Sequence, residues 1–260
     1  MPSPSIASTI RSEWIKFRSV RSTPVGYTVT AVLTIGLGIL ITVAIRSHWH
    51  TMDPLARIAF DPVATSLAGV LFSLFAIGVI GILYFSNEYA TGSIRPTLAA
   101  TPRRSRVVVA KVVVLTGATI VVAEIVAIVT FLIGQRIYAG VVPTASLGTP
   151  AVLRSVLLGG LYLTLLALLG LGLGLLIRHQ SAAISVYTTL LLILPIIVIF
   201  LPSSWQTTIS RYEPSSLGRA MMSVAPPDQM FGAWTAALVL TLYVVGVLGA
   251  ATMLLEKRDA

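Results

Sequence analysis

Six long stretches of predominantly apolar residues dominate this chain of 260 residues. They cover residues 25–45, 62–85, 107–133, 152–177, 182–201 and 233–255. A helix of about 20 residues crosses the roughly 30 Å hydrocarbon core of a bilayer and satisfies its own backbone hydrogen bonds there. Because the runs are continuous rather than alternating, they do not favour a β-barrel. The sequence therefore predicts an all-α integral membrane protein with six transmembrane helices, in which residues 1–260 form a single transmembrane domain.

The composition supports a membrane protein and excludes several classes of function. Hydrophobic residues make up 56% of the chain and charged residues 10%, whereas soluble domains carry about 25% charged residues. The chain has no cysteine, which excludes disulfides, thiol catalysis and cysteine-ligated metal centres. A net charge of +9 could suggest a nucleic acid partner, but the basic residues flank the apolar runs, where membrane orientation explains them. We therefore expect the lipid bilayer, and no nucleic acid, around this chain.

The basic residues also predict how the chain crosses the membrane. If the N-terminal segment is cytoplasmic, 12 of the 18 Lys and Arg residues fall in cytoplasmic segments and six in external ones. Since cytoplasmic loops are enriched in Lys and Arg, both termini are predicted to be cytoplasmic. Residues 86–106 then form an inner loop and residues 202–232 an extracellular loop. The first run, 25–45, is longer than the apolar core of a signal peptide, so we interpret it as a retained span.

An amphipathic segment, residues 6–22, precedes the first run. Ile6, Ile10, Trp14 and Phe17 follow helical spacing on one face, and arginines lie towards another. Glu13 and Lys16 are three residues apart and can form a weak pair. We interpret the segment as an interfacial helix lying on the inner leaflet, with an unstructured basic leader as the alternative. Its candidate site residues are Glu13, Trp14, Phe17 and Arg18.

The sequence lacks the motifs of known enzymes. It contains no G-x-x-x-x-G-K-[ST], H-E-x-x-H or G-x-S-x-G pattern. His48 and His50 lie two residues apart near Asp53, which is compatible with a weak metal site, but a solvated loop explains them better. We predict no catalytic residue, no metal site and no cofactor bound by this chain.

Glu124 is the ionisable residue that lies well inside a predicted span. A charge at the bilayer centre costs about 2.5–3.5 kcal/mol or more, so such residues usually face a bundle interior or water. Glu124 could line a substrate path, or it could form a hydrogen bond to a Ser, Thr or Tyr on a neighbouring helix.

Two features predict details of helix packing. Gly170 and Gly174 form a small-xxx-small pair, which allows close approach of another helix in lipid. Pro195 should kink the fifth span or end its regular part, because proline cannot donate a helical hydrogen bond.

The predicted cytoplasmic loop has an internal order of its own. Gly92 allows a sharp turn, and Ser93 is an acceptable N-cap for a short helix in which Ile94 and Leu98 share a face. The basic residues that follow could meet lipid phosphates or an acidic protein surface. They are Arg103, Arg104, Arg106 and Lys111.

This loop resembles the coupling segment of ABC type 2 permeases, which are the membrane subunits of ATP-driven transporters. The resemblance rests on residues 88–95, 98–100 and 102–106 and on Lys111. Residues 12–22 resemble the N-terminal elbow helix of that family, and residues 194–195 and 212–218 resemble its outer segment. Pro96 departs from the family's pattern, in which a polar residue is commoner.

The resemblance implies a division of labour. A separate ATP-binding subunit, which holds ATP and Mg, would dock on a coupling helix at residues 91–100. Two permease subunits, as a homodimer or a heterodimer, would form the substrate pathway of an exporter in a bacterial plasma membrane. The residues carried over to the ATPase-coupling interface are Glu88, Gly92, Ile94, Arg95 and Leu98, with Arg103 and Arg104 beside them.

Two other classes of function are the alternatives to a permease subunit. A stand-alone secondary transporter or channel would need several intramembrane charges or broken helices near the midplane, and this chain offers only Glu124 and Pro195. A membrane enzyme would need a catalytic set, which the motifs do not supply.

Overall fold

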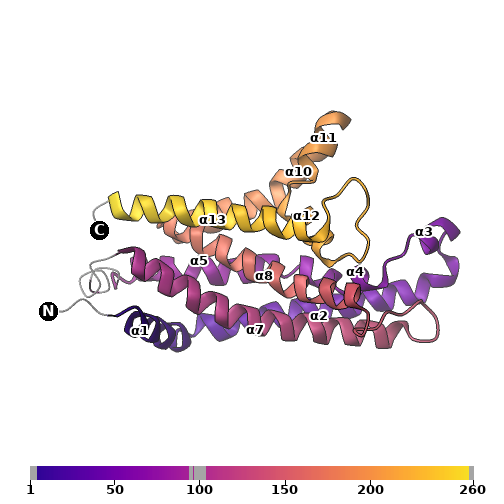
Figure 1. The fold of residues 1–260 in the computed structure, drawn as a ribbon, viewed down its shortest axis with the longest axis horizontal. Coiled ribbons are helices and arrows are strands. Elements are labelled where there is room, and N and C mark those ends of the chain that lie inside the picture. The colour runs from indigo at the N-terminus through magenta and orange to yellow at the C-terminus, as the bar shows by residue number, and fades with distance from the viewer. Residues whose placement is uncertain (1–4, 94–95, 97–103, 258–260) are drawn as a thin grey trace.

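The computed structural model describes residues 5–93, 96 and 104–257, and within them the chain forms helices and no β-strand. The longest helices run along the long axis of the molecule (Figure 1). They are α2 (Ser22–His48), α5 (Leu74–Ala90), α7 (Arg104–Tyr138), α8 (Pro150–Ile177) and α13 (Ala233–Lys257). The N-terminal helix α1 (Ile6–Ser19) lies at the end of the bundle where α13 finishes. We call this the α1 end and the opposite one the far end.

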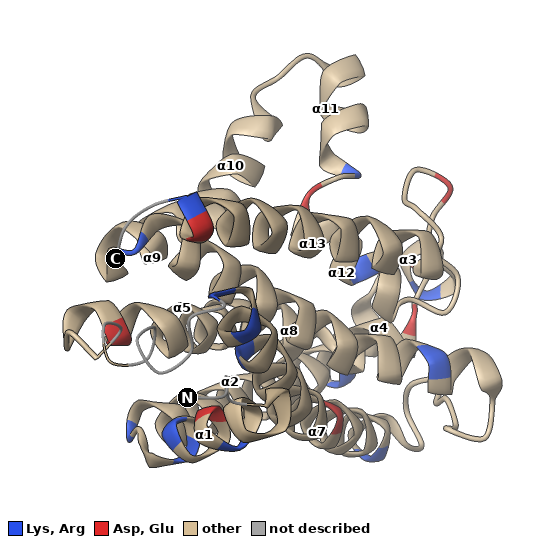
Figure 2. Ribbon diagram, turned by 60° about the vertical axis from the view of Figure 1, so that its left-hand side comes forward, with Lys and Arg blue, Asp and Glu red and all other residues tan. Residues whose placement is uncertain are grey.

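Five helical segments are long and apolar enough to cross a membrane. They are Ser22–Thr51, which joins α2 to the short turn η1 (Trp49–Thr51), then α7, α8, Gln180–Ile199 and α13. In Figure 2 these helices carry few acidic or basic residues along their length. The prediction of an all-helical, multi-pass membrane protein is confirmed, whereas the cytoplasmic placement of both termini stays a prediction.

The second predicted span, residues 62–85, is not a single helix. It consists of α4 (Pro62–Ser66), the 3-10 turn η2 (Ala68–Leu71) and α5, which alone is shorter than the other spans. The break occurs where the chain meets α2: the Thr34 hydroxyl donates to Ser73 Oγ at 2.7 Å. A Cβ at Gly69 would collide with the backbone oxygen of Thr34. The close approach of α2 therefore overrides the helical pattern of this run, and six spans stay a prediction.

Helix α8 is the centre of the bundle and packs against α5, α7 and α13. The predicted close approach at Gly170 and Gly174 is present between α8 and α5. A Cβ at Gly170 would collide with the backbone oxygen of Gly78, and one at Gly174 would lie 2.8 Å from that of Ile82. Because neither position has room for a methyl group, the two backbones pack directly against each other.

The fifth span is irregular in the part that Pro195 affects. It is built from α9 (Gln180–Thr188), a π-helical turn η3 (Thr189–Ile193) and α10 (Leu194–Ile199). The Leu194 N–H bonds to the Thr189 oxygen, five residues back, just before the proline that cannot donate. The predicted disturbance therefore takes the form of a wider turn immediately before Pro195.

The segment 202–232 is more ordered than the predicted extracellular loop. It contains α11 (Ser203–Ser210) and α12 (Pro214–Met222). Gly218 of α12 lies against the ring of Tyr162 in α8, and Leu217 and Met221 are buried. In contrast, α10 and α11 project away from the bundle (Figure 1). A further short helix, α3 (Pro54–Ile58), lies at the far end.

Replacing Gly170 with Ala should weaken the packing of α5 on α8, because overpacking of this kind costs about 1–3 kcal/mol. The measurement is the midpoint of thermal unfolding of the purified protein, which should fall. Gly117→Ala on α7 is the control, since a Cβ there meets no atom within 4 Å. Alanine favours a helix over glycine by up to about 1 kcal/mol, so the control midpoint should stay or rise. Equal midpoints for the two variants would contradict close packing at Gly170.

Candidate functional site

Helix α1 packs on the bundle through a face that differs from the predicted one. Thr9, Glu13 and Phe17 are buried, whereas Trp14 is 44% exposed. Phe17 packs edge-on against Tyr84 of α5 at a centroid distance of 4.8 Å. The predicted apolar face therefore splits: Phe17 enters the core and Trp14 stays on the outside. The start of α1 is fixed by Ser5, whose hydroxyl accepts a hydrogen bond from the Ser8 N–H.

Four charged residues meet at the α1 end, and we call them the ion cluster: Glu13 and Lys16 of α1, Glu88 of α5 and Lys111 of α7. Lys111 Nζ lies 2.7 Å from Glu13 Oε2 and 3.0 Å from Glu88 Oε1. Lys16 Nζ lies 2.8 Å from Glu13 Oε1 and 3.2 Å from Glu88 Oε1. The four pairs form a closed ring of alternating sign that joins three helices.

Burial distinguishes the two lysines of the ion cluster. The side chain of Lys111 is 0% exposed and that of Lys16 is 38% exposed. Lys111 Nζ also lies 4.3 Å from the centroid of the Tyr84 ring, within the range of a cation–π contact. The Tyr84 hydroxyl donates to Glu13 Oε2 at 3.3 Å. Lys111 is thus enclosed by two carboxylates and an aromatic face, as a buried charge requires.

The ring changes the acidity of its α1 members. Burial alone raises the pKa of the Glu13 carboxyl, but the charges and hydrogen bonds of Lys111 and Lys16 outweigh it and hold the pKa below its usual value. For Lys16, burial lowers the pKa, and Glu13 and Glu88 outweigh it, so the pKa rises. The Glu13 contribution to stability is therefore lost as pH falls through the lowered pKa, and that of Lys16 as pH rises through the raised one. Both residues are charged at neutral pH.

The position of Lys111 corrects the prediction that it meets lipid phosphates or an acidic partner surface. It lies inside the protein and is paired with residues 98 and 23 positions away in the sequence. A signal was present: Lys111 lies within the apolar run 107–133, where an unpaired charge is costly. The sequence did not reveal which carboxylates would pair with it.

The predicted coupling residues fall partly within the described residues. Glu88 is in the ion cluster, and Gly92 adopts a positive φ of 70° with open space where a Cβ would lie. Arg104 donates to the Leu255 oxygen at 2.6 Å, which joins the start of α7 to the end of α13. The other predicted coupling residues lie outside the described residues: Ile94, Arg95, Leu98 and Arg103. Their role, like that of Glu88 and Gly92, stays a prediction.

Arg18, a candidate residue of the predicted interfacial helix, is exposed on α1.

A polar contact at the far end was not anticipated from the sequence. Asp61 Oδ1 caps α4 by accepting from the Val63 and Ala64 N–H groups, and its Oδ2 accepts from the Ser223 hydroxyl at 2.9 Å. Arg154 of α8 donates to the Val224 oxygen at 2.9 Å. These contacts attach the end of α12 to α4 and α8.

Gln135 of α7 adds a second far-end contact. Its amide donates to the Pro62 oxygen at 3.1 Å and to Ser66 Oγ at 2.9 Å, and its Oε1 accepts from the Ala145 N–H at 2.7 Å. Helix α7 therefore carries Lys111 of the ion cluster at one end and Gln135 at the other. The sequence signal was a single amide near the end of an apolar run, which does not identify partners.

Glu124 lies on α7 against α8. A Cβ at Gly160 would lie 2.5 Å from Glu124 Cδ, so the glycine makes room for the carboxyl group. Glu124 Oε2 is buried without a hydrogen-bond partner, so this oxygen does not bond to a neighbouring Ser, Thr or Tyr. A role of Glu124 on a substrate path stays a prediction.

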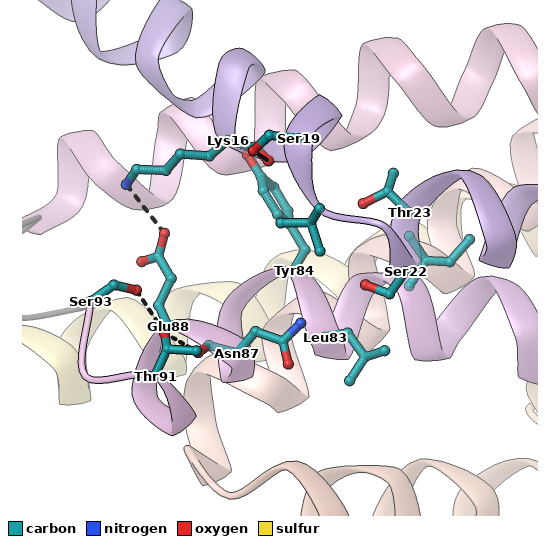
Figure 3. Close-up of a pocket in the computed structure, with 12 residues that line it drawn as sticks. Lys16, Ser19, Ser22, Thr23, Leu83, Tyr84, Asn87, Glu88, Thr91 and Ser93 are labelled. Atoms are coloured by element: carbon teal, nitrogen blue, oxygen red, sulfur yellow. Dashed lines mark hydrogen bonds and ion pairs between the residues drawn. The ribbon is translucent and has the colours of Figure 1, made fainter.

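A cavity of about 490 Å³ adjoins the ion cluster between α1, α2 and α5. Figure 3 shows Lys16 and Glu88 reaching towards each other at its edge. The walls combine polar and apolar side chains from the three helices and the link at Val20. They are Lys16, Ser19, Val20, Ser22, Thr23, Ile80, Leu83, Tyr84, Asn87, Glu88, Thr91 and Ser93.

A family model described as ABC-2 family transporter protein matches residues 9–196. The chain belongs to the ABC-2 transporter family. The match includes α1 from Thr9 onward, the ion cluster and the fifth span up to the residue after Pro195, and residues 1–8 and 197–260 lie outside it. No curated protein matches the chain.

Membership of the ABC-2 family identifies the chain as a membrane subunit of an ABC transporter. The resemblance noted in the coupling segment and the elbow helix is thereby confirmed at the level of the family. The ABC-2 permease is the transmembrane component and not itself the catalytic ATPase, and it normally works with an ATP-binding subunit.

Replacing Lys111 with Met should destabilise the protein strongly, because Glu13 and Glu88 lose their buried counter-charge. Removing one partner of a buried ion pair costs about 3–5 kcal/mol. Lys16→Met is the control, because Lys16 is only half-buried and without it Glu13 and Glu88 still share the charge of Lys111. The midpoint of thermal unfolding in detergent should fall much further for Lys111→Met.

A double variant tests the ring itself. In Glu13→Gln/Lys111→Met the remaining Lys16–Glu88 pair is balanced in charge, so this protein should unfold at a higher temperature than Lys111→Met alone. A double variant that is less stable than Lys111→Met would contradict the pairing.

Proposed function

We propose that this chain is the permease subunit of an ATP-driven exporter in a bacterial plasma membrane, and that the ion cluster transmits motion from a docked ATP-binding subunit into the membrane helices. The α1 end is cytoplasmic in this proposal, as the distribution of basic residues predicts. The ATP-binding subunit holds ATP and Mg and docks at residues 91–100.

The observation that carries this proposal is the position of the ring. Glu88 lies near the end of α5 and Lys111 lies two turns inside α7, so the proposed docking segment leaves one helix of the ring and enters another. Glu13 and Lys16 connect both helices to α1. A push on the segment therefore acts on three helices that are held together by buried charge.

Helix α7 offers a route from this ring to the far end. It is a continuous helix, and its residues Lys111 and Gln135 are separated by about 36 Å at 1.5 Å per residue. Gln135 contacts α4 and the loop at Ala145, as described above. A tilt of α7 driven from the ring would therefore alter contacts at the external side, which is what alternating access requires.

Replacing Ile94 and Leu98 with Asp should release the ATP-binding subunit while leaving membrane insertion intact. Burying one such side chain is worth about 1.5–3 kcal/mol, and about 1.4 kcal/mol corresponds to a tenfold change in affinity. Capture of a P-loop protein from native membranes, identified by mass spectrometry, should therefore fall more than about tenfold.

The matched control is Leu55→Asp with Ile58→Asp on α3, where the two apolar side chains are 76% and 83% exposed at the far end. This variant should retain the ATP-binding subunit. Unchanged capture by the Ile94/Leu98 variant would refute docking at the coupling segment.

We further propose that two permease subunits pair through the projecting arm formed by α10 and α11. The arm projects from its own bundle (Figure 1), and several of its apolar side chains are exposed. Ile197 is 52% exposed, Phe200 83% and Trp205 63%. Apolar area on an element that projects from its own subunit is suited to contact a neighbouring one.

The absence of cysteine from the chain makes this pairing simple to test. Phe200→Cys, treated with a bifunctional maleimide in native membranes, should give a covalent dimer of this chain. Leu55→Cys, at a position that is 76% exposed on α3, should give little. A Phe200→Cys protein that yields no more dimer than Leu55→Cys would contradict pairing of two copies through the arm.

A further inference from the structure

The cavity beside the ion cluster has the polarity gradient of a membrane interface. Its volume of about 490 Å³ lies within the roughly 300–1,000 Å³ typical of ligand sites. Along α5 the lining changes from Ile80 and Leu83 to Asn87 and Glu88, over about 12 Å of helix. The opposite wall comes from the end of α1 and the start of α2, with hydroxyl groups at Ser22 and Thr23.

The polar part of the cavity presents two opposite charges and an unused acceptor. Lys16 Nζ and Glu88 Oε1 are 3.2 Å apart, and the Lys16 side chain is 38% exposed. Both lysines of the ion cluster contact Oε1 of Glu88, while Oε2 is buried without a hydrogen-bond partner. Buried carboxylate oxygens are nearly always paired with a donor. The site therefore suits a ligand that brings N–H or O–H groups to Glu88.

The location restricts the chemistry of that ligand. The cavity lies where apolar helices meet an amphipathic N-terminal helix, a level at which a membrane protein is surrounded by lipid head groups. A zwitterionic head group matches the ion pair, with its phosphate near Lys16 and its ammonium near Glu88. Ethanolamine head groups carry N–H donors, whereas choline head groups carry none. The acyl chains of such a lipid would leave along Ile80 and Leu83.

We propose that this cavity binds the head group of an ethanolamine phospholipid from the surrounding bilayer, with its ammonium donating to the Glu88 carboxylate and its phosphate meeting Lys16. The bound lipid would hold α1 and α5 together at the edge of the ring. A regulatory effect on coupling rests on the proposed function, whereas binding of the lipid does not.

The test measures lipids retained by the purified subunit in native mass spectrometry, without ATP or a partner. Four dioleoyl phospholipids are offered in equal amounts, with ethanolamine, monomethylethanolamine, dimethylethanolamine and choline head groups. Retention should fall several-fold along this series as N–H donors are lost. Equal retention of the four lipids would overturn the proposal.

A cavity-filling variant identifies the site. Leu83→Trp places bulk in the cavity without changing the four charged residues, and it should lower retention of the ethanolamine lipid at least several-fold. Val113→Trp is the matched control, because Val113 lies on the same half of the bundle and is 47% exposed on α7. Equal retention by the two variants would place the lipid elsewhere and refute the site.

These outcomes are separable from those of the proposed function. Selective retention of the ethanolamine lipid, combined with no capture of an ATP-binding subunit, would refute the proposed coupling and leave the lipid site standing. Normal capture of that subunit, combined with equal retention of the four lipids, would refute the lipid site and leave the proposed coupling standing. If Leu83→Trp fails to fold, Thr23→Trp, which fills the same cavity from α2, takes its place.

Discussion

The ammonium group of Lys111 determines much of the arrangement at the α1 end. A charge with no exposed surface must be paired, and an unpaired one costs several kcal/mol. Its two partners come from different helices, Glu13 of α1 and Glu88 of α5. The places of α1, α5 and α7 are therefore interdependent. A displacement of any one of them separates charges in a region from which water is excluded.

This interdependence matters because of the segment that joins α5 to α7. The link follows Glu88 within a few residues and ends shortly before Lys111, so both of its ends are attached to the same ring. At the α7 side, Arg104 also contacts the end of α13. In the coupling we propose, motion imposed between these two ends would pass into the helices that carry Glu88 and Lys111.

Local features of the sequence predicted the helices well, because the length of an apolar run already decides whether a helix can cross a bilayer. Gly170 and Pro195 also acted as expected, since their effects depend on their own backbones. The features that the sequence did not predict arise from contacts between residues that are far apart in the chain. The break in 62–85 follows from the approach of Thr34 to Gly69, and Lys111 pairs with a residue 98 positions away. The contact between Asp61 and Ser223 spans 162 positions, and no local pattern could reveal it.

The two lysines of the ion cluster differ in how much it costs to separate them from their carboxylate partners. If Lys16 separates from Glu13 and Glu88, its 38% exposed side chain can be solvated, and Lys111 still keeps two carboxylates. If Lys111 separates, a charge with no access to water loses its partners. The ring should therefore open first at Lys16, because water can reach its half-buried ammonium group and cannot reach that of Lys111. The cavity lies along the edge between Lys16 and Glu88, so a ligand bound there acts on one of the two edges of the ring that Lys16 can open.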